Sequence, residues 1–181
     1  MSSSKKVFDR LDKLNIKYDM VEHPPAETTE EADKYIEGKE GARTKNLFLA
    51  NRKNRQYYLI VMDDKKMISL KDYNKLLNEK GMHFLDPKKV YEIMEQEVGI
   101  ISVFGLMNTN ENIKVFFDKD MIEENDLMTF HPDDNTKTLF IKNEDIFKLV
   151  KDSGYDYEIF DFKAGINELD FKKIEINFIF K

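Results

Sequence analysis

The sequence predicts an α+β fold, with a mixed, mostly antiparallel sheet that curves around a core and helices on the outside. Two pairs of strand-like segments each flank a short polar turn, at residues 51–55 and 132–135, which is the pattern of a β-hairpin. Helical and strand-like segments are mixed without a regular βαβ alternation, so we do not expect a Rossmann arrangement. A length of 181 residues favours one compact domain, and 41% hydrophobic residues suffice for its core.

Helices are predicted where a capping residue precedes apolar residues at helical spacing. Five segments have this pattern, and they begin at Ser4, Thr28, Ser69, Asp86 and Asn143. Pro87 follows Asp86, which is the favoured order of cap and first helical residue. We expect this helix to end at Gly99, and we expect a turn or a short helix at residues 119–125.

Strands are predicted where apolar residues alternate with polar ones or form short continuous runs. These segments are residues 18–22, 47–50, 57–62, 82–85, 114–118, 127–131, 136–142 and 158–162. The run at 57–62 is apolar throughout, so we place it at the centre of the sheet. Together the helices and strands define one domain at residues 1–162.

Residues 163–181 form a separate C-terminal extension in this interpretation. Ile174, Ile176, Phe178 and Phe180 are spaced two residues apart, which is typical of a strand. We predict an added edge strand there, and such an edge would allow two copies of the chain to pair as a homodimer.

Composition and charge exclude several classes of site. The chain has no cysteine, so disulfides, thiolate nucleophiles and zinc–thiolate sites are excluded. Its three histidines are far apart in the sequence, so a histidine-rich metal site is not expected. A net charge of −6 argues against general coating of nucleic acid, although a few lysines can still bind one nucleic-acid end. Neither a membrane-length apolar run nor a signal-peptide pattern is evident, so we expect a cytoplasmic protein.

The stretch GARTKNLFL, residues 41–49, holds the first candidate for chemistry. Polar residues precede an apolar run that we predict to be a buried strand, which puts Lys45 and Asn46 at the mouth of that strand. A lysine there offers a compact charge with three donors, which suits a phosphate or an oxyanion. The alternative is a solvated surface lysine.

Gly99 and Gly105 bracket a second candidate, the segment GIISVFG. Glycines allow a backbone to approach a ligand closely, so backbone N–H groups of this loop are candidates to bind an oxygen of a ligand. Ser102 has no histidine or acid partner evident in the sequence, and we interpret it as a loop hydrogen-bonding residue rather than a nucleophile.

Three stretches, in this order and at this separation, carry a family resemblance: ARTKNLFL at residues 42–49, GIISVFGLMN at 99–108 and FHPDDNT at 130–136. Through them the chain resembles the YbaK/ProX family of aminoacyl-tRNA deacylases, and most closely its freestanding prolyl-tRNA editing branch. The resemblance extends from Val7 to Phe162, which is nearly the whole chain.

The resemblance implies a strongly curved mixed sheet and hydrolysis of the ester that joins a wrong amino acid to a tRNA. In this branch the implied substrate is alanine on proline tRNA. The implied partner is mischarged tRNA, bound at its acceptor end, with prolyl-tRNA synthetase as a second partner. Neither a cofactor nor a metal is implied. We expect Lys45, Arg43, Lys53 and Arg55 to form a local basic rim for this tRNA.

The resemblance also implies roles for particular residues. The essential lysine of the family falls on Lys45, and the loop that faces the aminoacyl group falls on the segment from Gly99 to Gly105. We therefore predict Lys45, Gly99 and Gly105 as catalytic residues. The predicted substrate-binding residues are Thr44, Asn46, Ser102, Val103, Phe104 and His131. His131 is a candidate to bind a ribose hydroxyl or the substrate amine, and its alternative role is to order the turn that follows it.

One position departs from the family pattern. Relatives place a proline before Phe104, where this chain has Val103, and Ile100 and Ile101 replace smaller residues. Because proline would restrict the loop backbone, this change leaves the pocket shape and the accepted amino acid open. It also leaves two alternatives to a deacylase: a binding module of the same fold without turnover, and an assembly protein that uses its C-terminal strand.

Overall fold

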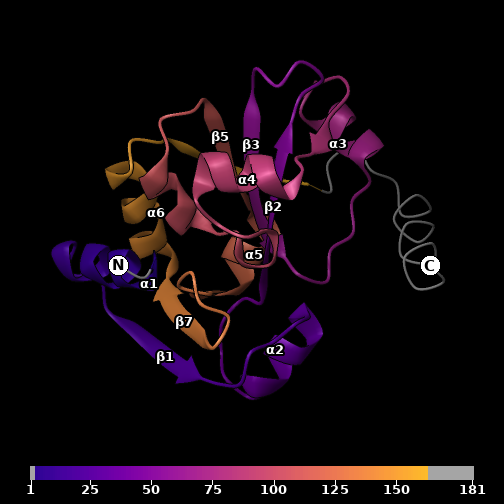
Figure 1. Ribbon diagram of the computed structural model, residues 1–181. Helices are drawn as coiled ribbons and strands as arrows, with labels where there is room; N and C mark the ends of the chain where they lie inside the picture. Colours follow the sequence, from indigo (N-terminus) through magenta and orange to yellow (C-terminus); the bar gives the residue numbers. More distant parts are fainter. Residues whose placement is uncertain (1–2, 163–181) are drawn as a thin grey trace.

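The computed structural model of the chain describes residues 3–162 (Figure 1). The predicted C-terminal extension at 163–181, with its edge strand, lies outside the described residues. The helices are α1 (Ser3–Lys13), α2 (Thr29–Tyr35), α3 (Leu70–Leu76), α4 (Pro87–Met94), α5 (Lys119–Glu124) and α6 (Asn143–Asp152). The strands are β1 (Tyr18–Glu22), β2 (Thr44–Ala50), β3 (Tyr57–Asp63), β4 (His83–Phe84), β5 (Ile113–Asp118), β6 (Leu127–Phe130), β7 (Lys137–Lys142) and β8 (Tyr157–Phe160).

The strands form two sheets, which confirms the predicted mixed α+β class. β1, β7 and β6 make an antiparallel three-stranded sheet, and β4, β2, β3, β5 and β8 make a five-stranded sheet in that order. In the larger sheet β2 is antiparallel to β3 and β4, whereas β5 is parallel to both β3 and β8. Parallel neighbours require long crossover connections, and the helices α3 to α6 lie in those connections.

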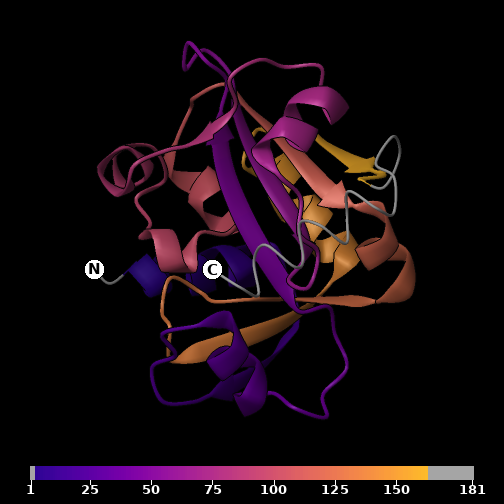
Figure 2. The same ribbon diagram turned by 90° about the vertical axis from the view of Figure 1, so that its right-hand side faces the viewer.

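The small sheet and α2 lie together at one end of the molecule, beyond the ends of β2 and β3 (Figures 1 and 2). β2 joins the two regions, because Ala42, just before β2, forms a bridge to Met128 of β6. The side-chain hydroxyl of Thr129 also donates to the carbonyl of Ala42, at 2.8 Å. The start of β2 therefore lies where the two sheets meet.

Apolar residues on the two faces of the large sheet form two cores. Tyr57, Leu59 and Val61 of β3 face the major core, which also receives residues of α1, α4, α5 and α6. Tyr58, Ile60 and Met62 alternate with them and face the minor core, which is covered by α3 through Tyr73. This alternation follows from the two-residue period of a strand, and it explains why the segment is apolar throughout.

Most predicted strand bounds differ from the structure by one or two residues, and three larger differences concern the candidate site and α6. β2 begins at Thr44, so Lys45 lies within the strand rather than before it. α4 ends at Met94, where Glu95 takes a left-handed backbone conformation with φ 53°, so Gly99 is not its end. The side chain of Asn143 does not cap α6, because its amide donates instead to the carbonyl of Asn125 at 2.6 Å.

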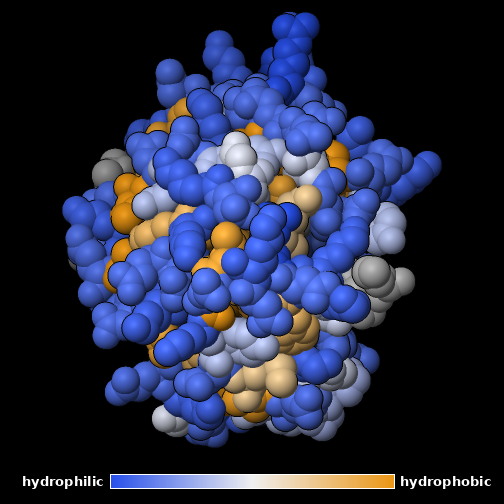
Figure 3. Space-filling view, turned by 90° about the vertical axis from the view of Figure 1, so that its left-hand side faces the viewer, coloured by the Kyte–Doolittle hydropathy of each residue, from blue (hydrophilic) through white to orange (hydrophobic). Residues whose placement is uncertain are grey.

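The face of the molecule in Figure 3 is mostly hydrophilic, with small hydrophobic areas between the polar side chains. This agrees with the 35% of charged residues in the sequence. Within residues 3–162, no helix is both long and apolar enough to cross a membrane.

Candidate active site

Lys45 is the second residue of β2 and lies opposite Met62 of β3. Because side chains alternate along a strand, it shares a face with Leu49, on the side of the minor core. Its half-buried amine donates to the backbone carbonyl of Lys66 and lies 3.8 Å from the sulfur of Met67. The segment that follows β3 thus holds the end of this side chain in place.

Burial lowers the pKa of Lys45 from its ordinary value, because an ammonium loses hydration there. The carboxyl groups of Asp64, Asp63 and Asp118, when ionised, oppose this effect and favour the charged amine. Burial is the larger influence, so the net direction is downward. The site therefore holds a poorly hydrated cation close to carboxylates, an arrangement common where charge is used for binding or catalysis.

Asn46 points to the opposite face of β2, where its neighbour across the sheet is Val61 of the major core. Its side-chain Oδ1 is buried and has no hydrogen-bond partner within residues 3–162. A buried acceptor of this kind usually has a partner, so this oxygen is exceptional among the described residues. Thr44, on the same face as Asn46, instead donates its hydroxyl to the carbonyl of Thr129. Thr44 thus links the two sheets.

The segment from Gly99 to Gly105 folds into two short 3-10 helices, at Val98–Ile100 and Val103–Asn108. Besides Ile100, whose backbone N–H donates to the carbonyl of Glu97 at 3.0 Å, three backbone N–H groups of the segment are bonded around Ser102. Ser102 donates to Gln96 Oε1 at 3.1 Å, Phe104 to Ser102 Oγ at 3.2 Å, and Gly105 to the Ser102 carbonyl at 3.1 Å. These three groups are therefore occupied and do not form a ready cradle for a carbonyl oxygen.

The two apolar candidates of this segment, Val103 and Phe104, are both fully buried in the major core. Phe104 packs edge-on against Phe130 of β6, with 6.0 Å between ring centroids. The residue that replaces the family proline is therefore a packing residue of the core, and it influences the site through the shape of the loop.

Gln96 was not identified from the sequence, yet it organises the glycine-bracketed segment. It is only 1% exposed, and its amide nitrogen donates to Asp133 Oδ1 at 2.6 Å and to Ser102 Oγ at 3.2 Å. A Cβ at Gly105 would approach Gln96 Oε1 to 2.4 Å, so the glycine is required for this close contact. Gln96 thus connects the segment to the turn that follows His131, and a single glutamine after a helix carries no sequence signal for that role.

His131 follows β6 and is half-buried. Its Nδ1 lies 2.7 Å from the carbonyl of Lys137, and since a carbonyl only accepts, Nδ1 carries the proton. Burial lowers the pKa of His131, the nearby His23 lowers it further, and the bond to Lys137 opposes both. The ring is therefore favoured in its neutral form, in which Nε2 is a hydrogen-bond acceptor.

Asp64 and Asp33 form a second group that the sequence did not reveal. Burial, together with a hydrogen bond to Asp33 of α2 and the charge of Asp33, raises the pKa of Asp64 to about 8. Asp64 also acts on the charge of Lys45, and Asp33 acts on that of His131. Through these charge interactions, the carboxyl pair couples electrostatically to both the lysine and the histidine.

The prediction that Lys45, Arg43, Lys53 and Arg55 form one basic rim is wrong. The guanidinium of Arg43 donates to the carbonyls of Gly41, Ile36 and Lys39, each at 2.8 Å, and so fixes the segment after α2. Lys53 and Arg55 lie in the loop at the opposite end of β2 from Lys45. At about 3.3 Å per strand residue, that loop is roughly 20 Å away. A hairpin separates residues that sequence proximity had grouped together.

Comparison with known proteins identifies the family. A family model described as an aminoacyl-tRNA editing domain matches residues 23–149, which is more than half of the chain. The chain belongs to this family. Its editing domain includes all nine residues predicted for the site, and the membership agrees with the enzyme class predicted from the sequence, an aminoacyl-tRNA deacylase.

Relatives of this editing domain are found in bacteria and animals. The prolyl-tRNA editing protein ProX of Acetoanaerobium sticklandii is 31% identical over 159 residues, covering 87% of this chain and 96% of the relative. The prolyl-tRNA synthetase associated domain-containing protein 1 of Bos taurus is 31% identical over 156 residues, covering 84% of this chain and 91% of the relative.

Solved structures show the same fold. One, named provisionally as a trans-editing enzyme for prolyl tRNA synthetase, matches with a TM-score of 0.67 and 18% identity, covering 88% of this chain and 96% of that one. A second, a hypothetical protein, matches with a TM-score of 0.67 and 14% identity, covering 85% and 97%.

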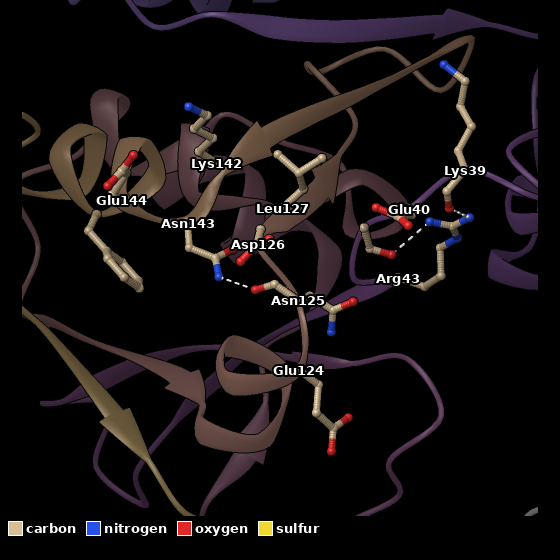
Figure 4. Close-up of a pocket in the computed structure, with 12 residues that line it drawn as sticks. Lys39, Glu40, Arg43, Glu124, Asn125, Asp126, Leu127, Lys142, Asn143 and Glu144 are labelled. Carbon is tan, nitrogen blue, oxygen red and sulfur yellow. Dashed lines mark hydrogen bonds between the residues drawn. The ribbon is translucent and has the colours of Figure 1, made fainter.

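A separate cavity of the editing domain, of about 1100 Å³, lies between the segment before β2, the turn before β6 and the start of α6 (Figure 4). Its charged side chains have both signs, and Arg43 at its wall is bonded to backbone carbonyls. A second cavity, of about 560 Å³, lies along the ends of β5 and β8. None of the nine predicted site residues, all of which are described, lines either cavity.

Proposed function

We propose that this editing domain hydrolyses the ester of mischarged tRNA, and that its substrate is alanine attached to proline tRNA. The family membership supports an editing reaction, and the names of the two relatives refer to prolyl-tRNA editing or to prolyl-tRNA synthetase. The observation that carries the proposal is the half-buried amine of Lys45, held at the junction of the two sheets beside Asp64.

In this proposal Lys45 binds the ester or the terminal phosphate of the tRNA. An ammonium has three donors; the carbonyl of Lys66 takes one, and the sulfur of Met67 is a weak partner for a second. A remaining donor binds an oxygen of the substrate, whose negative charge grows as water attacks the ester carbon. A poorly hydrated ammonium stabilises that charge more strongly than a hydrated one would.

His131 and Asn46 orient the substrate in the same proposal. The neutral His131 ring accepts a hydrogen bond at Nε2 from a ribose hydroxyl or from the attacking water, while its Nδ1 is held by Lys137. Asn46 Oδ1, which is buried and unpartnered within residues 3–162, accepts from the amino group of the aminoacyl moiety. Both groups act as acceptors and so complement the donor Lys45.

Selection of alanine over proline rests on size exclusion in this proposal. One methylene changes binding in a hydrophobic pocket by only about 1–3 kcal/mol, so a second site that admits the smaller side chain adds useful accuracy. Val103 contributes by packing under the loop, since its side chain is fully buried.

The test is hydrolysis of purified alanyl- and prolyl-tRNA(Pro) by the wild type, Lys45→Ala and Lys53→Ala. We expect release of alanine by the wild type and a loss in kcat/KM of about 100-fold or more for Lys45→Ala, as for removal of one charge-stabilising donor. Lys53 is exposed in the distant loop and serves as the matched control.

Two outcomes would contradict the proposal. If the wild type leaves alanyl-tRNA(Pro) intact at high enzyme concentration, the substrate assignment fails. Saturable binding of that tRNA without release of alanine would favour the alternative, a binding module without turnover.

We also propose association with prolyl-tRNA synthetase and a homodimer through the C-terminal extension. The name of the animal relatives supports the first, and the spacing of apolar residues at 174–180 supports the second. Size-exclusion chromatography with and without the synthetase tests the first. Comparison of the full chain with a variant ending at Phe162 tests the second, and unchanged elution volumes would contradict both.

A further inference from the structure

Lys66 is the centre of a buried ion-pair network. Its ammonium lies 2.6 Å from Asp118 Oδ1 and 3.0 Å from Asp120 Oδ2. The side chain of Lys66 is 12% exposed, and that of Asp118 is 1% exposed. Charges this deeply buried are costly to desolvate, and hydrogen-bonded partners of opposite charge are what make them tolerable.

The network reaches Lys45 through the backbone of the same residue. The carbonyl of Lys66 accepts the hydrogen bond from the Lys45 amine, while the Lys66 side chain is tied to the end of β5 by Asp118. The N–H of Lys66 also donates to the Asp63 carbonyl at 3.1 Å, and the N–H of Asp63 donates to Asp118 Oδ2 at 3.4 Å. Both ends of the segment from Asp63 to Lys66 are thus anchored to Asp118.

Asp118 also acts on Lys45 through its charge. The carboxylates around the Lys45 amine are Asp63 and Asp64 at the end of β3 and Asp118 at the end of β5, and all three oppose the effect of burial on its pKa. Asp118 is completely buried, so water screens its field less than that of an exposed group.

We propose that Asp118, acting through Lys66, is a positioning residue for the Lys45 amine. This inference rests on the proposed function, in which Lys45 binds the substrate. Asp118 holds the Lys66 carbonyl where it fixes the amine, and its charge favours the protonated form of the amine. Asp120 is the outer partner that steadies Lys66.

The first test measures Lys45 directly and needs no substrate. The protein is labelled with ¹³C at lysine Cε, the Lys45 signal is assigned by its loss in Lys45→Arg, and its pKa is followed by NMR titration. In Asp118→Asn we expect this pKa to fall below that of the wild type, because one nearby opposite charge is lost. A Lys45 titration identical to that of the wild type would overturn the inference.

The second test is the pH profile of deacylation. If the protonated amine is the active form, activity declines as pH rises through the pKa of Lys45. The alkaline limb should therefore move to lower pH in Asp118→Asn, with kcat affected more than KM. A uniform loss at all pH values, with an unmoved limb, would indicate a merely structural role.

Two further variants keep the inference testable. Glu123→Gln removes the partner of Lys119 in an exposed pair of α5 and should change neither the Lys45 signal nor kcat.

If Asp118→Asn does not fold, Asp120→Asn replaces it, since Asp120 is 28% exposed. We expect a changed Lys45 Cε chemical shift and a severalfold lower kcat, and wild-type values for both would overturn the inference. If the wild type hydrolyses no tested tRNA, the proposed function fails. The NMR result still decides whether Asp118 positions Lys45.

Discussion

At the scale of single residues, the site depends on the face of β2 to which each side chain points. Lys45 and Asn46 are neighbours in sequence, but they point to opposite faces of the strand. The amine is held by Lys66 after β3, whereas the amide oxygen is buried on the face of the major core. A substrate that contacts both must therefore reach around the start of β2, where the sheet meets α2.

The unpartnered oxygen of Asn46 leads to a prediction about stability. Asn46→Leu replaces the amide with an apolar side chain of similar size, which removes an unpaired buried acceptor. We expect the free energy of unfolding to stay the same or to rise by about 1–3 kcal/mol, the cost of such an unpaired group. Deacylation should fall at the same time. Urea unfolding and the tRNA assay measure the two effects, and a large loss of stability would show that the oxygen has a partner after all.

At the scale of elements, the glycine-bracketed segment and the turn after β6 behave as one unit because Gln96 bonds to both. Ser102, Phe104 and Gly105 use their N–H groups within this unit. The segment therefore contributes shape and rigidity, and its two glycines have different roles.

The two glycines make a matched pair of variants. A Cβ at Gly105 would meet Gln96 Oε1 at 2.4 Å and Met94 Cε at 2.7 Å, whereas a Cβ at Gly99 would meet nothing within 4 Å. We expect Gly105→Ala to lower the free energy of unfolding by about 1–3 kcal/mol through overpacking. Gly99→Ala should leave it nearly unchanged. Urea unfolding of both variants checks this, and equal stability of the two would contradict the role given to Gln96.

At the scale of the whole molecule, the end of the large sheet is joined to α2 by the pair of Asp64 and Asp33. Since burial and Asp33 raise the pKa of Asp64 to about 8, the folded protein holds a proton there that the unfolded chain releases at a much lower pH. This group therefore stabilises the fold fully only at low pH. Its contribution is lost progressively as pH rises from about 4, the unfolded pKa of an aspartate, to about 8.

Asp64→Asn tests this coupling, because an amide cannot release a proton. We expect the free energy of unfolding of the wild type to fall between pH 5 and pH 8 relative to that of the variant, and the difference to level off above pH 8. Asp19→Asn, at an exposed position of β1, is the control. A constant difference between the wild type and Asp64→Asn across this range would show that Asp64 is ionised throughout.

Much of the fold follows from local rules that act over a few residues. The caps at Thr28, Ser69 and Asp86 each accept a backbone N–H in the structure, as their positions before apolar runs predict. The hairpin of β2 and β3 and that of β6 and β7 follow from polar turns between apolar segments. The order of three motifs also indicated the family, which the comparison confirmed.

The sequence by itself thus determined the elements, the fold class and the family, because capping, periodicity and motif order are written within short stretches of chain. Only the tertiary structure showed which groups surround Lys45. It also showed that Gln96, Asp64 and Asp118 interact with residues of the candidate site. The physical reason is that hydrogen bonds and charge interactions act over a few ångströms of space. Strand pairing brings Lys45, Lys66 and Asp118 within that range, although they lie far apart in the sequence.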